Sequence, residues 1–310
     1  MRNKKIVVTG GAGFIGSNLT RTLALKNKTI VIDNLSTGKL ENIDDLIEKK
    51  QIDFINGSIN DIDLLQETFK GVDYVFHQAA IPSVPKSIKN PAETNHANIN
   101  GTLNVLIASK NNNVKKVIYA SSSSVYGDTP SLPKKEEMNP FPLSPYAISK
   151  LTGEYYCQVF TSVYKLPTIT LRYFNVYGPR EDPDSEYAAV IPRFIKRIIE
   201  NKPPIIFGDG KQTRDFTFID DVVKANILAA ESKTIGVFNI AGGKKITINS
   251  LAKKIMKIIG KKTEIIHEKP RPGDIRHSLA DISKAKKGFN YKPCFDLEYG
   301  LKETIKWFYM

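Results

Sequence analysis

The chain has 310 residues, of which 41% are hydrophobic and 25% are charged, as is ordinary for a globular protein with a substantial core. Its two cysteines, Cys157 and Cys294, are far apart and lack CxxC or His-rich spacing, which argues against a disulfide framework and against a metal site. They predict buried thiols in a reducing compartment, the cytoplasm. The apolar run at the N-terminus is too short for a signal peptide, and no run of about 18 apolar residues predicts a membrane span.

The formal net charge of +13 is compatible with nucleic acid, an anionic membrane surface or an anionic small substrate as partner. The lysines are dispersed, however, and lack the aromatic interleaving of a nucleic-acid platform. We therefore expect a solvated, lysine-rich surface and no nucleic-acid or membrane partner. Local basic residues for a phosphorylated ligand are the second interpretation.

Short β-branched runs alternate with helical patterns from residue 5 onward. The runs are KIVVTG, TIVIDN, IDFINGS, VDYVFHQAA, VKKVIYASSS and TITLRYFNVYGP. Because parallel strands need helical crossovers on the sheet faces, this order predicts an α/β fold with a doubly wound parallel Rossmann-type sheet over residues 1–176.

Proline and glycine punctuation after residue 176 predicts a smaller C-terminal α/β substrate lobe over residues 177–310. The boundary is soft. The segment GVFNIAGG, residues 236–243, reads as a further sheet strand, which would make the chain pass between the lobes more than once.

The segment VTGGAGFIG places Gly10, Gly13 and Gly16 at GxxGxxG spacing between a strand and a helix. Glycines permit a tight turn and let backbone N–H groups approach a pyrophosphate, and the helix N-terminus attracts its charge. Asp33 ends the next strand, where a carboxylate can accept both ribose hydroxyls and repel the extra phosphate of NADP. The pattern predicts bound NAD, while nearby Lys39 leaves NADP as the alternative.

The segment LSPYAISK predicts a helix start, with Ser144 as N-cap and Pro145 in the first turn. Tyr146 and Lys150 then fall at i and i+4 on one helical face. A lysine ammonium and an oxidised nicotinamide ring would both favour the phenolate, and so lower the tyrosine pKa from its usual value near 10. The pair would then act as a general base whose proton affinity depends on bound NAD. The alternative is an aromatic residue and a lysine on an ordinary helix.

Seven segments occur in a recognisable order: GxxGxxG, HQAA, SSSSVYG, YAISK, RYFNVYGPR, GDGKQTRDFTFIDD and RPGDIRHS. Together they resemble the extended short-chain dehydrogenase/reductase family over nearly the whole chain, and within it the nucleotide-sugar 4-epimerases of the UDP-glucose / UDP-N-acetylglucosamine type. The resemblance implies that Tyr146 is the catalytic base, that Lys150 binds the nicotinamide ribose, and that Ser122 hydrogen-bonds the sugar's 4-hydroxyl. Ser123 and Ser124 remain alternatives to Ser122. It also implies tightly bound, recycled NAD, and a homodimer formed through helices that include the one bearing Tyr146.

The resemblance extends to further contacts. It implies cofactor contacts from Gly10, Gly13, Phe14, Ile15, Gly16, Asp33, Asn34, Ser36, Thr37, Gly38, Ser58, Ile59, Gln78, Ala79, Ala80, Asn98, Tyr146 and Lys150. It implies contacts with a UDP-sugar from Ser83, Ser122, Ser123, Ser124, Tyr146, Asn175, Ala189, Val190, Arg214, Arg271, Asp274 and Ser278.

Three of these positions bear on recognition of the diphosphate and of the adenine. Arg214 and Arg271 match arginines that clamp the UDP diphosphate, a task suited to the planar guanidinium fork. The alternative for Arg214 is an ion pair with Asp215 or Asp220. Ser58 departs from the family pattern, because it replaces an aspartate that accepts the adenine amine.

The serine run decides the expected reaction. Dehydratases of the family carry TDE before the VYG and decarboxylases carry TSE, whereas this chain has no carboxylate there. A hydroxyl, a phenolate and tightly held NAD therefore predict 4-epimerisation of a UDP-hexose through a transient 4-keto sugar.

Small residues suggest the sugar. Ser278 stands where a tyrosine restricts relatives to unsubstituted sugars, and Ala189 is also small, so we expect interconversion of UDP-GlcNAc and UDP-GalNAc, with some activity on UDP-glucose and UDP-galactose. UDP-glucuronate 4-epimerase is the alternative. It is less favoured because its members usually have threonine where this chain has Asn175, and because Glu181 adds a negative charge. A non-catalytic NAD-binding regulator is the alternative from another class.

Overall fold

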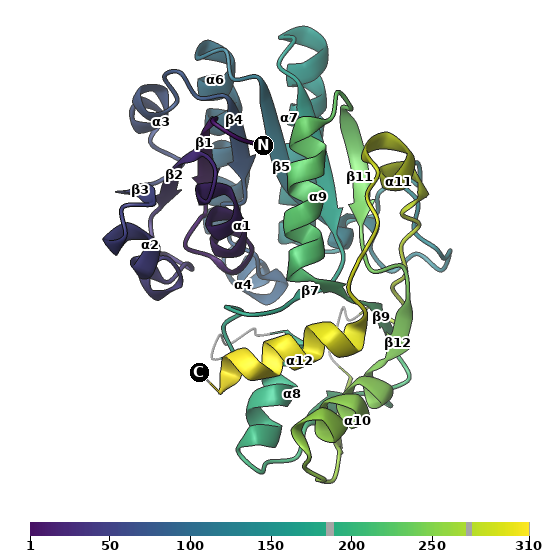
Figure 1. Cartoon of the computed structure of the whole chain (residues 1–310). Helices are drawn as coiled ribbons and strands as arrows, with labels where there is room; N and C mark the ends of the chain where they lie inside the picture. Colours follow the sequence, from purple (N-terminus) through teal and green to yellow (C-terminus); the bar gives the residue numbers. More distant parts are fainter. Residues whose placement is uncertain (184–188, 271–274, 310) are drawn as a thin grey trace.

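The fold is organised around one seven-stranded parallel sheet (Figure 1). The computed structural model describes residues 1–183, 189–270 and 275–309. The strand order is β11-β6-β5-β4-β1-β2-β3 with every neighbouring pair parallel, which confirms the predicted doubly wound sheet. The strands are β1 (Lys5–Thr9), β2 (Lys28–Asp33), β3 (Ile52–Asn56), β4 (Tyr74–His77), β5 (Lys116–Ser122), β6 (Thr168–Tyr173) and β11 (Gly236–Ile240).

Helices cover both faces of the sheet, because the strands carry apolar side chains on both sides. Ile6 and Val8 of β1 belong to the core that includes α1 and α9, while Val7 belongs to the core that includes α6 and α7. The covering helices are α1 (Phe14–Ala24) and α9 (Ile219–Glu231) on the first face, and α3 (Ile62–Thr68), α6 (Gly101–Asn111) and α7 (Pro145–Val163) on the second.

β11 brings the chain back to the sheet after residue 176. It pairs with β6 in parallel register, from Gly236 opposite Ile169 to Ile240 opposite Tyr173. α11 (Ser283–Phe289) lies against it, with the rings of Phe238 and Phe289 5.2 Å apart. The sequence left this crossing open, and the division at residue 176 stays a prediction.

The remaining elements form a smaller, loop-rich group, in which α8, α10 and α12 lie beyond one end of the sheet (Figure 1). Phe194, Leu251 and Leu301 from these three helices belong to the same core as α1 and α9. The group contains three helices and several short strands: α8 (Val190–Ile199), α10 (Ile248–Ile259), α12 (Leu297–Phe308), β7 (Val176–Tyr177), β8 (Ile205–Phe207), β9 (Thr213–Asp215), β10 (Thr217–Phe218), β12 (Lys245–Thr247) and β13 (Ile266–Glu268).

Short helical segments fill the connections. Ser83 and Asn90 cap α4 and α5 by accepting hydrogen bonds from the N–H groups of Lys86 and Glu93. The segments are η1 (Leu40–Asn42), α2 (Asp44–Glu48), α4 (Val84–Lys89), α5 (Pro91–Asn95), η2 (His96–Asn100) and η3 (Ser123–Tyr126).

The prediction that both cysteines are buried is right for one of them and wrong for the other. Cys157 is buried in α7, but Cys294 is exposed, since it lies in the loop before α12. Its backbone N–H donates to Asp221 at 2.7 Å, and its Sγ lies 2.9 Å from Nζ of Lys224. In the described parts of the chain, no helix is long and apolar enough to cross a membrane, and no group of three metal-ligating side chains gathers.

Candidate active site

The glycine turn lies where the strand order reverses, between β1 and β4, the place where doubly wound sheets bind ligands. Gly10 has φ +71°, and a Cβ there would come within 2.6 Å of the backbone of Ala79. A Cβ on Gly16 would lie 2.0 Å from the Gly10 carbonyl oxygen. Gly13 caps α1 without a side-chain hydrogen bond, so the first N–H groups of the helix face outward. The turn therefore fits a pyrophosphate.

Asp33 fits the adenosine ribose. This buried carboxylate accepts the N–H of Ala12 at 2.9 Å and the N–H of Leu35 at 2.8 Å, which leaves lone pairs for ribose hydroxyls. Burial raises its pKa, and the two N–H groups oppose the rise. Lys39, the reason for considering NADP, forms an ion pair with Asp182 at 3.1 Å. These contacts favour NAD over NADP.

Two predicted cofactor residues brace neighbouring elements. Gln78 Nε2 donates to Asn226 Oδ1 at 3.2 Å and lies 3.3 Å from the Tyr173 hydroxyl. Asn98 accepts the N–H of Ile81 at 2.8 Å and donates to Oγ of Ser149 in α7 at 3.0 Å. Both amides therefore hold the end of β4 beside the site.

The other predicted cofactor residues lie along the carboxyl ends of β1 to β4. Ser58 Oγ accepts the N–H of Asn60 at 3.1 Å, and Ile59 is buried. Asn34, Ser36 and Thr37 are exposed in the loop after β2, Gly38 contacts Asp33, Phe14 and Ile15 open α1, and Ala79 and Ala80 follow β4.

Tyr146, Lys150 and Ser122 come together as predicted from the sequence. Ser144 caps α7 by accepting the N–H of Ala147 at 3.1 Å. One turn later, Lys150 Nζ donates to the Ala120 carbonyl at 2.9 Å and lies 5.9 Å from the Tyr146 ring centre. Ser122 ends β5 beside the Tyr146 side chain, and its hydroxyl lowers the Tyr146 pKa. The three side chains can therefore act on one substrate hydroxyl.

Burial and hydrogen bonding set the charges of this group. Burial raises the pKa of Tyr146 above its usual value, and the Ser122 hydrogen bond opposes that rise. Burial lowers the pKa of Lys150 to about 8. The tyrosine therefore needs a positive charge beside it to ionise near neutral pH, and Lys150 supplies one.

The four adjacent serines differ in their contacts. Ser121 Oγ donates to Glu154, and Ser122 contacts Tyr146. Ser124 donates its N–H to Ser122 Oγ at 3.1 Å, and its own buried Oγ has no hydrogen-bond partner in the described part of the chain. Ser123, half-buried, begins η3. These contacts favour Ser122 for the 4-hydroxyl.

Sequence reasoning missed His77, which lies in the HQAA segment at the end of β4. Its Nε2 and Nδ1 lie 2.8 Å from the hydroxyls of Thr102 and Thr9. Since the Thr102 hydroxyl donates to the Asn98 carbonyl at 2.6 Å, it accepts from His77 Nε2, which leaves Nδ1 to accept from Thr9. Burial, followed by the charge of Lys150, lowers the His77 pKa to about 3. His77 is therefore a neutral brace.

The predicted substrate residues lie on short elements. Asn175 adopts φ +36° and donates to the Asp215 carbonyl at 2.9 Å. Arg214 Nη1 donates to the Thr213 carbonyl at 2.9 Å. Ser278, 8% exposed, donates its N–H to the same carbonyl at 3.0 Å. The predicted Arg271 and Asp274 lie outside the described residues, Ser83 caps α4, Ala189 is exposed, and Val190 begins α8.

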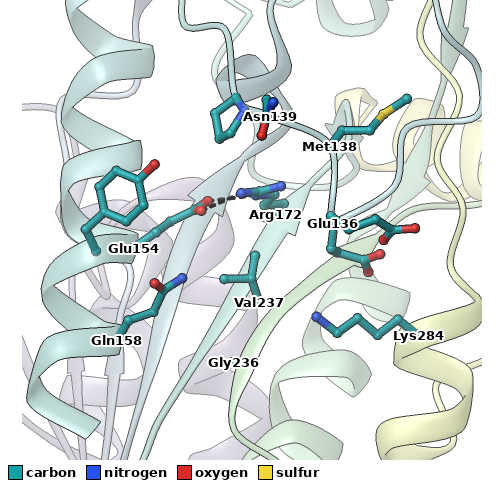
Figure 2. Close-up of a pocket in the computed structure, with 12 residues that line it drawn as sticks. Glu136, Met138, Asn139, Glu154, Gln158, Arg172, Gly236, Val237 and Lys284 are labelled. Atoms are coloured by element: carbon teal, nitrogen blue, oxygen red, sulfur yellow. Dashed lines mark hydrogen bonds and ion pairs between the residues drawn. The ribbon is translucent and has the colours of Figure 1, made fainter. Parts of the chain in front are cut away.

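A separate pocket of about 390 Å³ lies between α7, β6, β11 and α11 (Figure 2). Glu154, Gln158 and Lys284 line it, and Figure 2 shows the Glu154 carboxylate reaching Arg172. Its lining contains none of the residues predicted to contact NAD or sugar.

A dinucleotide turn followed by a tyrosine, a lysine and a serine at one sheet edge defines a class: an enzyme that moves a proton at a hydroxyl-bearing carbon while NAD exchanges a hydride with it.

The comparisons with known proteins identify the family. Residues 6–241 match the model of the NAD dependent epimerase/dehydratase family, and the chain belongs to this family. It is 42% identical over 305 residues to a putative UDP-glucose 4-epimerase of Methanocaldococcus jannaschii, with 97% of each chain covered.

Solved structures of UDP-sugar 4-epimerases are also similar to this chain. The UDP-N-acetylglucosamine 4-epimerase of Methanobrevibacter ruminantium M1, in complex with UDP-N-acetylmuramic acid, is 47% identical with TM-score 0.97 and covers 100% of this chain and 99% of its own. The UDP-glucuronic acid 4-epimerase of Bacillus cereus, with UDP-glucuronic acid and NAD, is 39% identical with TM-score 0.91 over 98% of each chain. The protein is thus an extended short-chain dehydrogenase/reductase and a NAD-dependent UDP-sugar 4-epimerase.

Proposed function

We propose that the protein interconverts UDP-GlcNAc and UDP-GalNAc, with some activity on UDP-glucose and UDP-galactose. The observation that carries the reaction is the meeting of Tyr146, Lys150 and Ser122 with no acidic side chain in the serine run. Glu154, behind Ser121, is 1% exposed and paired with Arg172, so it is not free to protonate a leaving group. This arrangement suits epimerisation and not elimination.

The proton steps follow from the three side chains. Tyr146 removes the proton of the 4-hydroxyl, Ser122 holds that oxygen by a hydrogen bond, and the Lys150 ammonium stabilises the phenolate. Tyr146 gives this proton back when the 4-hydroxyl is restored, and NAD, when bound, would supply the acceptor and donor of the carbon 4 hydride. Arg214 and Arg271 hold the diphosphate while the 4-keto sugar turns about its link to it, so that the returned hydride reaches the opposite face.

Small, buried Ser278 supports the N-acetylated sugar. It is 8% exposed, and its N–H donates to the carbonyl of Thr213, which precedes Arg214 in β9. The small side chain of Ser278 at this place would leave room for the 2-acetamido group of the sugar. The similarity to the UDP-N-acetylglucosamine 4-epimerase of Methanobrevibacter ruminantium supports the same choice.

UDP-glucuronate remains the second candidate sugar because of the similarity to the Bacillus cereus enzyme. The charge of Glu181 no longer argues against UDP-glucuronate as the substrate. Burial raises the pKa of this carboxyl to about 8, so it is mostly protonated at neutral pH.

We propose a homodimer in the cytoplasm. Large apolar side chains recur along one exposed stripe of α7: Ile148, Tyr155, Val159 and Val163 are 50%, 52%, 46% and 62% exposed. This spacing keeps them on one face, and a contiguous apolar face indicates an interface. Light scattering of the purified protein should give twice the chain mass, and Val159→Glu should reduce it to one chain mass.

One experiment separates the candidates. The purified protein, without added NAD, is incubated separately with UDP-GlcNAc, UDP-glucose and UDP-glucuronate, and the products are resolved by anion-exchange chromatography. We expect fastest epimerisation of UDP-GlcNAc. Turnover of UDP-glucuronate alone would support the second candidate, and no turnover despite bound and added NAD would support the regulator.

A further inference from the structure

A buried network lies directly behind the catalytic residues. Glu154 of α7 accepts hydrogen bonds from Arg172 Nε at 2.9 Å and Nη2 at 2.6 Å (Figure 2). It also accepts a hydrogen bond from the Ser121 hydroxyl. The guanidinium lies 4.7 Å from the ring centre of Tyr126. Glu154, Arg172 and Ser121 are 1%, 3% and 3% exposed. No step of the mechanism above uses this network.

The network pins α7 to the sheet next to the site. Lys150 bonds the Ala120 carbonyl, and one turn later Glu154 bonds the Ser121 side chain. Two successive turns of α7 thus hold two successive residues of β5, and the next residue is Ser122. Arg172, opposite Ser121 in the parallel register, ties the same carboxylate to β6. The contacts therefore fix the distance between Ser122 on the strand and Tyr146 on the helix.

The network also sets the charge beside Lys150. The titratable groups packed around Lys150 and Tyr146 are His77, Tyr119, Cys157, Glu154 and, through Glu154, Arg172. Burial keeps the first three neutral: it lowers the His77 pKa to about 3, raises the Tyr119 pKa well above its usual value, and raises the Cys157 pKa to about 12. Burial lowers the Lys150 pKa, and Cys157 and Glu154 oppose it. Because the thiol is neutral, the opposing charge is that of Glu154.

We propose that Glu154 is a positioning residue of the epimerase: through Ser121 and Arg172 it holds Ser122 at its working distance from Tyr146, and its carboxylate places a negative charge one helical turn from Lys150. The proposal rests on the roles of Tyr146, Lys150 and Ser122 given above.

The positioning part is tested with Ser121→Ala and Glu154→Asp. The first removes one arm of the network and leaves the ion pair, and the second keeps the charge on a shorter side chain. We expect kcat to fall about tenfold in each, with KM for the UDP-sugar and the bound NAD per chain unchanged. Wild-type kcat in Ser121→Ala overturns this part.

The charge part is tested with Glu154→Gln, which leaves Arg172 uncompensated beside Lys150. With the carboxylate gone, Lys150 loses its proton more easily, so the ionisation midpoint of Lys150 should fall by about one pH unit. Nitrogen-15 NMR titration of the lysine-labelled holoenzyme, with Lys150→Arg as the reference that lacks this signal, measures this midpoint. An unshifted midpoint overturns the charge part, and Glu154→Asp should keep the wild-type midpoint.

Leu301→Ala controls for lost stability. Leu301 is fully buried in α12, so this variant should lower Tm without changing kcat or the midpoint. The fall in kcat of Ser121→Ala and Glu154→Asp is compared with that of Leu301→Ala, which loses stability elsewhere. If it is no larger than in Leu301→Ala for the same loss of Tm, the network affects stability alone and the proposal fails. The titration needs no sugar, so it tests Glu154 even if no UDP-sugar is epimerised, a result that would count against the proposed function alone.

Discussion

The two halves of the candidate site are built differently. In the sheet half, Gly10, Ser122 and Tyr146 lie at the ends of long strands or on a 19-residue helix, and buried contacts hold them. In the other half, Arg214 and Ser278 lie on or beside a strand of three residues. The difference teaches that the residues proposed for the chemistry lie on rigid elements, while those proposed to choose the sugar lie on segments that can vary without disturbing the sheet.

Removing the base should have the largest effect and should affect only the sheet half. In Tyr146→Phe, turnover should fall by about a thousandfold, because a positioned general base contributes this much. Bound NAD, measured by chromatography of the released nucleotide, should stay at the wild-type level. Tyr155→Phe, on the exposed face of the same helix, is the control. Full activity of Tyr146→Phe would disprove the mechanism.

Closing the glycine turn should weaken the cofactor without changing the sugar preference. A Cβ on Gly16 would lie 2.0 Å from the Gly10 carbonyl oxygen, and overpacking of this kind costs about 1–3 kcal/mol. In Gly16→Ala we expect NAD affinity, measured by calorimetry, to fall about 10- to 100-fold. In Gly71→Ala the Cβ meets no atom within 4 Å, but the φ of +69° strains an alanine. This variant therefore controls for lost stability away from the site, and it should bind NAD normally. Equal loss in both variants would show general destabilisation.

A large side chain in place of Ser278 should change the sugar preference without changing the cofactor half of the site. Ser278→Tyr should reduce kcat/KM for UDP-GlcNAc about tenfold or more relative to UDP-glucose, the scale of discrimination that pocket size gives. Bound NAD per chain should stay at the wild-type level. An equal loss for both sugars would contradict the assignment of Ser278.

The smallest effect is the pH dependence of the unmodified enzyme. Burial lowers the Lys150 pKa to about 8, so the ammonium loses its proton as pH rises through that value, and with it the stabilisation of the phenolate. We expect kcat to fall above about pH 8 by up to tenfold per unit. The residual activity of Lys150→Arg should lack this alkaline fall, since arginine stays charged.

The sequence predicted the parts of the site that depend on local spacing. The turn at Gly10 and the i, i+4 pair of Tyr146 and Lys150 follow from backbone geometry alone. The network of Glu154, Arg172 and Ser121 was missed, because it joins a helix to two strands and depends on which face of β5 each serine occupies. His77 was missed for the same reason, since its partners are 68 and 25 residues away.

The wrong prediction for Cys294 has a different cause. Thiols are buried on average, and nothing local contradicted that average. Its exposure follows from the long-range hydrogen bond to Asp221 on α9, which fixes the loop at the surface.

The return of β11 to the sheet determines how the protein can be divided. All six residues of β6 are buried, and β11 satisfies the backbone groups along one side of that strand. A fragment that ends at residue 176 would expose β6 as an unpaired edge strand, which is a template for aggregation. The cofactor half is thus continuous in space but not in sequence, and a stable minimal fragment must include residues 236–240.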